Sequence, residues 1–133
     1  MKYIRRPKSN QQAFNAVVRH LYHQKSRSSN ARNNCLYRSN DGLKCAVGAL
    51  IPDRFVNTEN NSMNINTLIR KNVEYANWFK DVDVGLLNSL QVVHDSIGNW
   101  IFPSNMYLEL VIVANEYNLN LRQVYQLDWL KKE

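Results

Sequence analysis

The chain has 133 residues, of which 44% are hydrophobic, and its formal net charge is +6. This length and composition fit one globular domain and argue against a disordered chain. No apolar run approaches the ~20 residues of a membrane span, and no apolar segment follows the basic N-terminus, so we expect neither a membrane anchor nor a secretory signal. The two cysteines are too few for a disulfide framework, which favours a reduced, cytoplasmic protein.

The positive charge is concentrated in the first third of the chain. Residues 1–45 contain ten Lys or Arg and one acid, whereas residues 46–133 contain seven Lys or Arg and ten acids. This asymmetry favours an anionic partner for the basic part, either nucleic acid or an acidic protein surface. The simpler alternative is an ordinary solvated surface.

The first part of the chain is expected to form a basic arm, a helix and a polar loop. Residues 1–8 are basic, and Pro7 disfavours a helix before it. Ser9 is a suitable N-cap for a helix from about Asn10 to Gln24, with Gln12 three residues on as in a capping box. Residues 26–34 are small, polar and basic, which is typical of a loop. The expected inward face of the helix consists of Phe14, Val17, Val18, Leu21 and Tyr22.

Residues 35–48 predict a β-hairpin. Asp41-Gly42 is a strong signal for its turn, because a type I′ turn needs positive φ at both central positions. With the turn centred on Asp41-Gly42, Arg38 lies opposite Cys45 on the other strand. Cys35 and Cys45 are then too far apart for a disulfide. In an alternative interpretation, the apolar residues 45–51 begin a short helix after a brief second strand.

Helices predominate in the rest of the chain. Short ones are expected over residues 66–71 and 73–80, longer ones over 83–96 and 103–118, and a last one after residue 120. Tyr75, Trp78 and Phe79 have helical spacing and are interpreted as core rather than as a platform for stacking bases. In the helix over 103–118, the expected inward stripe consists of Tyr107, Leu108, Val111, Ile112 and Tyr117.

The predicted fold class is therefore α+β. We expect a mostly helical single domain over residues 1–133, with one β-hairpin at about 35–48 and a basic arm at about 1–8. No internal repeat and no domain linker is recognisable.

Cysteine chemistry is the sharpest enzymatic hypothesis. Cys45 follows Lys44 and lies close to a possible helix start, and both features favour a thiolate. His94 and Asp95 would supply a base and a carboxylate. Adjacent residues on a helix do not face each other, however, and a cysteine in an apolar run is more often a small buried side chain. No catalytic residue is favoured, and an enzyme that uses Cys45, His94 and Asp95 is the alternative.

The spacing of the possible ligands disfavours a metal site. Zinc motifs usually hold two cysteines about two to four residues apart, whereas nine residues separate Cys35 from Cys45. His20, His23 and His94 are the remaining candidate ligands. We predict no metal and no other cofactor, because the sequence also has no Gly-rich phosphate loop.

The basic residues of the first third are the expected contacts with a partner. They could bind phosphates, with an affinity that falls steeply in salt. No helix-turn-helix or other DNA-reading motif is recognisable. The candidate contacts are Arg5, Arg6, Lys8, Arg19, Lys25, Arg27, Arg32, Arg38 and Lys44.

Two blocks of the sequence resemble a group of small uncharacterised proteins from tailed phages and bacteria. The first block consists of Tyr37-Arg38, Gly42-Leu43-Lys44-Cys45-Ala46-Val47-Gly48 and Ile51-Pro52-Asp53, and the second of Leu90-Gln91, His94-Asp95 and Trp100. The resemblance covers about residues 35–117. It implies an accessory protein of a phage or mobile element, and it implies no particular activity or functional residue.

Charge and resemblance together predict a small basic protein that binds a host macromolecule in the host cytoplasm and inhibits or redirects it. The expected partner is a host protein or protein–nucleic-acid complex, such as a nucleic-acid-handling or defence protein, and direct binding of nucleic acid is a further option. We expect no membrane role and predict no oligomeric state.

Overall fold

Helices form the regular structure of the protein. The structure is a computed structural model that describes residues 4–30 and 35–129. The helices in this part of the chain are α1 (Asn10–Gln24), the 3₁₀ turns η1 (Gly48–Leu50) and η2 (Asp53–Phe55), α2 (Ile65–Lys71), α3 (Val73–Trp78), α4 (Val84–Asp95), α5 (Ile97–Ile101), α6 (Pro103–Glu116) and α7 (Arg122–Tyr125).

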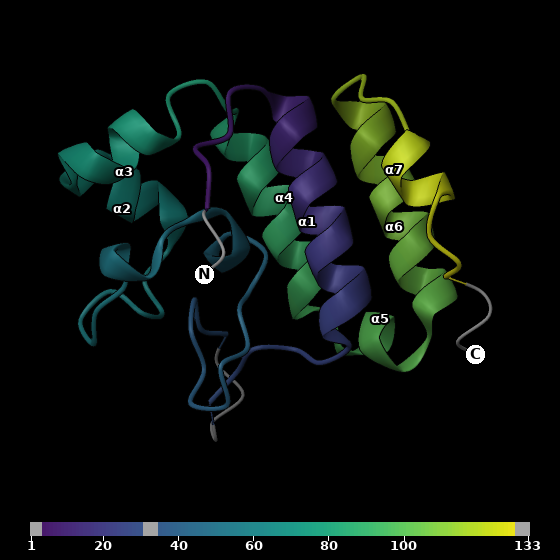
Figure 1. The fold of residues 1–133 in the computed structure, drawn as a ribbon, viewed down its shortest axis with the longest axis horizontal. Coiled ribbons are helices and arrows are strands. Elements are labelled where there is room, and N and C mark those ends of the chain that lie inside the picture. The colour runs from purple at the N-terminus through teal and green to yellow at the C-terminus, as the bar shows by residue number, and fades with distance from the viewer. Residues whose placement is uncertain (1–3, 31–34, 130–133) are drawn as a thin grey trace.

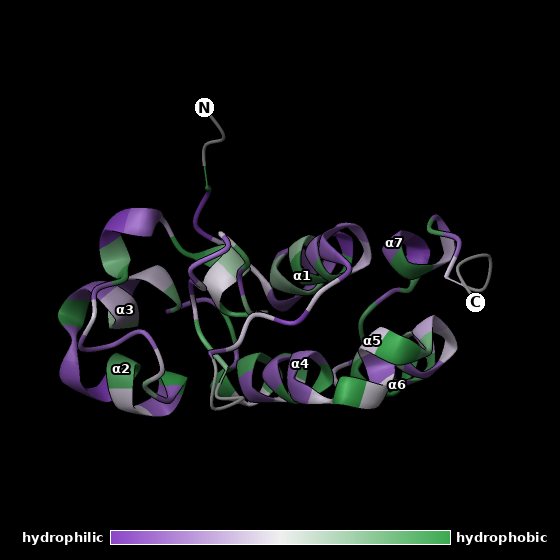
Figure 2. Ribbon diagram, turned by 90° about the horizontal axis from the view of Figure 1, so that it is seen from below, coloured by the Kyte–Doolittle hydropathy of each residue, from purple (hydrophilic) through white to green (hydrophobic). Residues whose placement is uncertain are grey.

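The longer helices lie in two layers. Helices α1 and α7 form one layer, and α4, α5 and α6 form the other (Figure 2). Helices α2 and α3 lie at one end of the molecule, beyond α4 (Figure 1). Among the residues described, no helix combines the length and the apolar character that crossing a membrane requires.

Local signals determine α1 as the sequence predicts. The Ser9 hydroxyl accepts a hydrogen bond from the backbone N–H of Gln12 at 3.1 Å, which satisfies one of the free donors of the first turn. The Gln12 side chain reaches back to the N–H of Lys8 at 2.9 Å. Phe14 and Val18 on the predicted inward face are fully buried.

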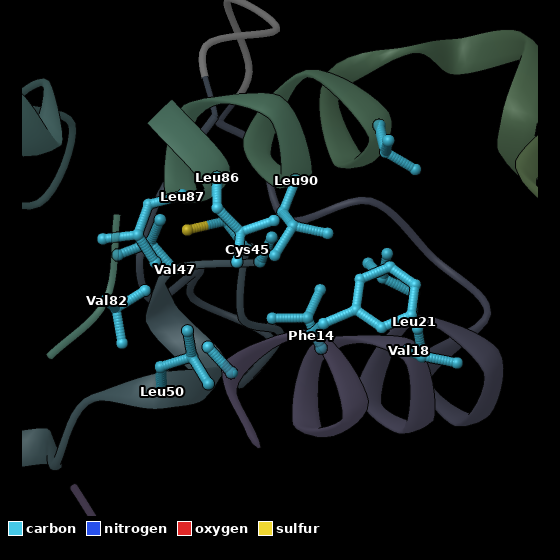
Figure 3. Close-up of a cluster of buried hydrophobic side chains, with 14 of the residues drawn as sticks. Phe14, Val18, Leu21, Cys45, Val47, Leu50, Val82, Leu86, Leu87 and Leu90 are labelled. Carbon is cyan, nitrogen blue, oxygen red and sulfur yellow. The ribbon is translucent and has the colours of Figure 1, made fainter. Parts of the chain in front are cut away.

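The core lies mainly between α1 and α4. Phe14 and Leu21 of α1 point toward α4, from which Leu86 and Leu90 point back (Figure 3). Cys45 lies inside this cluster and is 2% exposed. Burial of these side chains supplies the main free energy of folding, at about 25 cal/mol per Å² of apolar surface.

The predicted α+β class is wrong, because the described residues contain no β-strand and only one isolated bridge, between Ser29 and Cys35. A turn does form at Gly42, but it is not the predicted type I′ turn, because Asp41 does not have the positive φ that such a turn needs. Gly42 has φ 82°, a value that favours glycine, and the N–H of Ser39 donates to the carbonyl of Leu43 at 2.9 Å. The flanking segments, however, do not continue as a ladder.

Side-chain amides take the place of the missing strand partners. The amide of Gln24 donates to the carbonyl of Lys44 and accepts from its N–H, both at 2.8 Å. The amide of Asn61 does the same for Arg38, at 2.8 and 2.9 Å. Since backbone groups must be paired when they leave water, these contacts satisfy the donors and acceptors that a hairpin would have used.

The short helix considered as the alternative forms as the 3₁₀ turn η1. It carries Gly48 so close to the preceding segment that a Cβ there would lie 2.4 Å from the carbonyl oxygen of Tyr37. The guanidinium of Arg38 bridges this crossing, with donors 2.9 Å from the Tyr37 oxygen and 2.7 Å from the carbonyls of both Gly48 and Ile51. Its Nε also donates to Asp53 at 2.8 Å.

The predicted inward stripe of α6 is wrong for two of its residues, whereas Tyr107 and Tyr117 are partly buried against the core as predicted. Leu108 and Ile112 point away from the core and are 55% and 63% exposed. The helix is apolar on two sides, so its periodicity does not single out one inward face. The buried face consists instead of Met106, Leu110, Val113 and Ala114.

Candidate functional site

A cavity of about 620 Å³ lies between α4, the segment that follows α1 and the loop before α2. Its wall includes both cysteines, together with Arg27, Gln91 and Asp95. Cys45 and Asp95 of the predicted enzymatic alternative line this cavity, whereas His94 does not, so the geometry of these three residues decides what chemistry the cavity can support.

His94 is held in one tautomer at the end of α4. The side chain is fully buried, and its Nε2 atom accepts the backbone N–H of Ser28 at 3.1 Å. Because an amide N–H can only donate, Nε2 has the free lone pair and Nδ1 carries the proton. Nδ1 lies 2.9 Å from Oδ1 of Asp95. These neighbours in sequence therefore do contact each other, contrary to the expectation from regular helix geometry.

Asp95 collects several hydrogen bonds and stays ionised. Gln91 Nε2 donates to Oδ1 of Asp95 at 2.9 Å. Partial burial acts to raise the pKa of Asp95, but the hydrogen bonds from His94, Cys35 and Gln91 outweigh it and hold the pKa below its usual range. The carboxylate therefore orients these side chains at the cavity wall.

The thiol next to Asp95 belongs to Cys35 and not to Cys45. Burial raises the pKa of Cys35 to about 12, and the hydrogen bond to Asp95 acts in the same direction. Burial also raises the pKa of Cys45 to about 12. Both thiols are protonated near neutral pH, whereas a nucleophilic cysteine needs thiolate character.

The geometry does not provide a Cys–His pair. The lone pair of His94 Nε2 is directed at the amide of Ser28, so it is not free to accept a proton from either thiol. The Sγ atom of Cys45 accepts the N–H of Gly48 at 3.2 Å inside the core. Cys45 therefore acts as a small core side chain, the interpretation that its apolar sequence context favours.

The hydrogen bonds of His94 also decide whether a metal ion could bind here. Donor atoms of Cys35, His94 and Asp95 lie within 4.8 Å of one another, and they are the one such group among the described residues. Coordination through Nδ1 of His94 would move its proton to Nε2, where it would face the N–H of Ser28. Coordination through Nε2 would displace that same N–H. The donor set does not fit a metal in this arrangement.

A second hollow, of about 510 Å³, lies where the N-terminal arm crosses α1, and we call it the arginine hollow. Arg5, Arg6 and Arg19 line it, together with Gln12 and Asn15, and none of the described residues in its wall is acidic. It therefore brings together three of the predicted partner contacts, from two separate segments.

The arginines of this hollow differ in what they already bind. Arg6 pairs with Asp81 at 2.7 Å, which lowers the pKa of that carboxyl group through the hydrogen bond. Arg19 donates to Gln123 Oε1 at 2.8 Å, so a neutral amide is its partner. Arg5 and Lys8 have exposed side chains.

The other predicted contacts lie elsewhere. Arg38 binds backbone carbonyls and has a structural role. Arg27 faces the cavity beside Cys35, at 3.2 Å from its Sγ atom. Lys25 lines a smaller apolar hollow of about 200 Å³, and the backbone of Lys44 is held by Gln24. Arg32 lies outside the described residues.

The chain has no match among protein-family models, curated proteins or solved structures. The choice between the cavity and the arginine hollow therefore rests on geometry and charge.

Proposed function

We propose that the protein binds nucleic acid through the arginine hollow. The observation that carries this proposal is the convergence of Arg5, Arg6 and Arg19 on one hollow, in which no acidic side chain from residues 4–30 or 35–129 takes part. Arginine suits this role because its planar guanidinium can bind phosphate oxygens in a bidentate manner.

The rest of the hollow has suitable chemistry for a phosphate backbone. Gln12 and Asn15 add amide groups of the kind that commonly contact phosphates and sugars. Ala49 and Leu50 contribute an apolar floor. No stacked aromatic lines the hollow, so we expect backbone contacts with little base preference among the groups described.

The broader role follows from the resemblance stated above. We propose a phage-type accessory protein that acts in the host cytoplasm on nucleic acid or on a complex that handles it. The positive charge of residues 1–45 supports this role, because it would attract a polyanion from a distance. The predicted cysteine enzyme is not proposed, since the thiol of Cys45 is buried and protonated near neutral pH.

Fluorescence anisotropy with labelled single- and double-stranded oligonucleotides tests the proposal. Three arginine–phosphate contacts predict that log K falls with log salt concentration with a slope of about −2 to −3. The double variant R5E/R19E should abolish binding at low salt. Arg6 is left in place because its pair with Asp81 ties the arm to the body of the protein.

A matched control separates the hollow from net charge. R70E/K71E reverses two exposed cations of α2 and changes the net charge by the same amount as R5E/R19E. We expect this control to retain most of the affinity. Equal losses in the two double variants would contradict the proposal, as would full binding by R5E/R19E or no binding by the wild type.

A further inference from the structure

The outer side of the α4–α6 layer is apolar. Leu108 and Ile112 lie one turn apart on α6, and Val92 of α4 is 61% exposed. Side chains of both helices line one shallow hollow of about 270 Å³, which includes Val92, Ile112 and Glu109. In Figure 2, α1 and α7 cover the other side of this layer, and no described helix covers the outer side.

Leu108 extends the apolar surface beyond this hollow. It lies one turn before Ile112 on α6 and is 55% exposed. Single exposed apolar residues are common, but a concentration of them on one layer is typical of an interaction site. We call this set the apolar face; it consists of Val92, Leu108 and Ile112.

Carboxylates lie at the edge of the apolar face. Residues 81–121 contain five Asp or Glu and no Lys or Arg, and the two of these acids that lie on α6 are Glu109 and Glu116. Glu109 lines the hollow itself, where one of its oxygens accepts a hydrogen bond from Asn99. Glu116 is exposed and follows Ile112 by four residues, which places both on one side of α6. A partner that buries the apolar face would thus meet carboxylates at its edge.

We propose that the apolar face binds an amphipathic helix with a basic polar side, supplied by another protein. A helix of this kind places apolar side chains at i, i+3, i+4 and i+7 into a groove between two helices, here the groove between α4 and α6. Its Lys or Arg residues would then lie near Glu109 and Glu116. Charge complementarity of this type raises the association rate and disfavours acidic partners.

A second copy of the chain fits this face less well. In a two-fold symmetric dimer the same patch meets itself, so Glu109 and Glu116 would approach their own counterparts with no cation from residues 81–121 to separate them. A helix with a basic polar side would instead place Lys or Arg next to these carboxylates, so no such repulsion arises. The apolar face and the arginine hollow lie on different elements, so either can fail without the other.

Binding of designed peptides provides the test. The probe is a fluorescein-labelled amphipathic peptide of about 18 residues, roughly five helical turns, with Leu on one side and Lys on the other. A control peptide carries Glu in place of every Lys. Anisotropy titrations with the full chain should give at least about tenfold tighter binding of the Lys peptide, and the difference should shrink in high salt.

Two double variants locate the site. V92K/I112K should weaken binding of the Lys peptide at least about tenfold, because two large apolar side chains lose their burial. V73K/Y125K places lysines at two other exposed apolar positions, on α3 and α7, and should bind like the wild type. Binding should also be unchanged in R5E/R19E.

The opposite results overturn the proposal. These are equal binding of the two peptides, no binding of the Lys peptide, or equal losses in both lysine double variants. Sedimentation equilibrium of the chain alone adds a further outcome: a dimer that V92K/I112K dissociates would assign the apolar face to a second copy of the chain.

Discussion

Replacing Arg38 should destabilise the fold far more than a surface arginine would. Its side chain is 17% exposed, and it donates to the carbonyl oxygens of Tyr37, Gly48 and Ile51 at 2.7 to 2.9 Å. A hydrogen bond to a charged group contributes roughly 1.5 to 3 kcal/mol. Allowing for rehydration of some carbonyls, R38M should lower the free energy of unfolding by about 3 to 5 kcal/mol. R38K should lower the free energy of unfolding by about half as much. The lysine ammonium can still donate to some of these carbonyls, but it cannot reproduce the planar fork of the guanidinium.

Asp53 supplies the matched control for this prediction. Its side chain is 86% exposed, so the Arg38–Asp53 ion pair is screened by water and D53N should stay within about 1 kcal/mol of the wild type. Urea unfolding followed by tryptophan fluorescence measures all three variants. A loss below about 1 kcal/mol for R38M, or equal losses for R38M and D53N, would refute the structural role assigned to Arg38.

The pKa shifts give two more predictions. The pKa of Asp95 is lower in the folded state than in the unfolded state, so its stabilising effect is present above the unfolded pKa and is lost as pH falls through the folded one. D95N should therefore be less stable than the wild type at pH 7 and equally stable in acid, and a pH-independent difference in urea unfolding would contradict this. Iodoacetamide at pH 7.5 should alkylate Cys35 slowly and Cys45 only after unfolding, because burial raises both pKa values to about 12; rapid alkylation of Cys45 in the native protein, detected by mass spectrometry, would restore the enzyme hypothesis.

Features controlled by adjacent residues could be predicted from the sequence. The start of α1 depends on Ser9 and Gln12, which are three residues apart. The positive φ of Gly42 likewise follows from the conformational freedom of glycine, although the predicted type I′ turn at Asp41-Gly42 does not form. The hairpin failed because its backbone partners come from Gln24 and Asn61, which lie outside the predicted strands. No local pattern indicates which distant amide will take a backbone group.

For the predicted site residues, too, the sequence shows which side chains carry charge, whereas tertiary contacts decide where they lie. The grouping of basic residues placed Arg5, Arg6 and Arg19 among the candidate contacts, and these converge on one hollow. The same reasoning included Arg38, since charge alone does not distinguish a solvated arginine from one that binds carbonyls. The contact between Cys35 and Asp95 was missed because tertiary packing joins residues far apart in sequence.

The side chains of Gln24 and Asn61, each of which binds both the N–H and the carbonyl of one backbone residue, also affect how the protein responds to prolonged heating. A third pair joins Gln11 to the backbone of Asn120, with distances of 2.8 and 3.2 Å. Each pair needs a donor and an acceptor on one side chain, and hydrolysis of the amide to a carboxylate removes the donor. Asn and Gln are among the residues that hyperthermophilic proteins avoid for their lability. Hydrolysis of Gln11, Gln24 or Asn61 during prolonged heating would therefore remove a backbone hydrogen bond at one of three separate points of the fold.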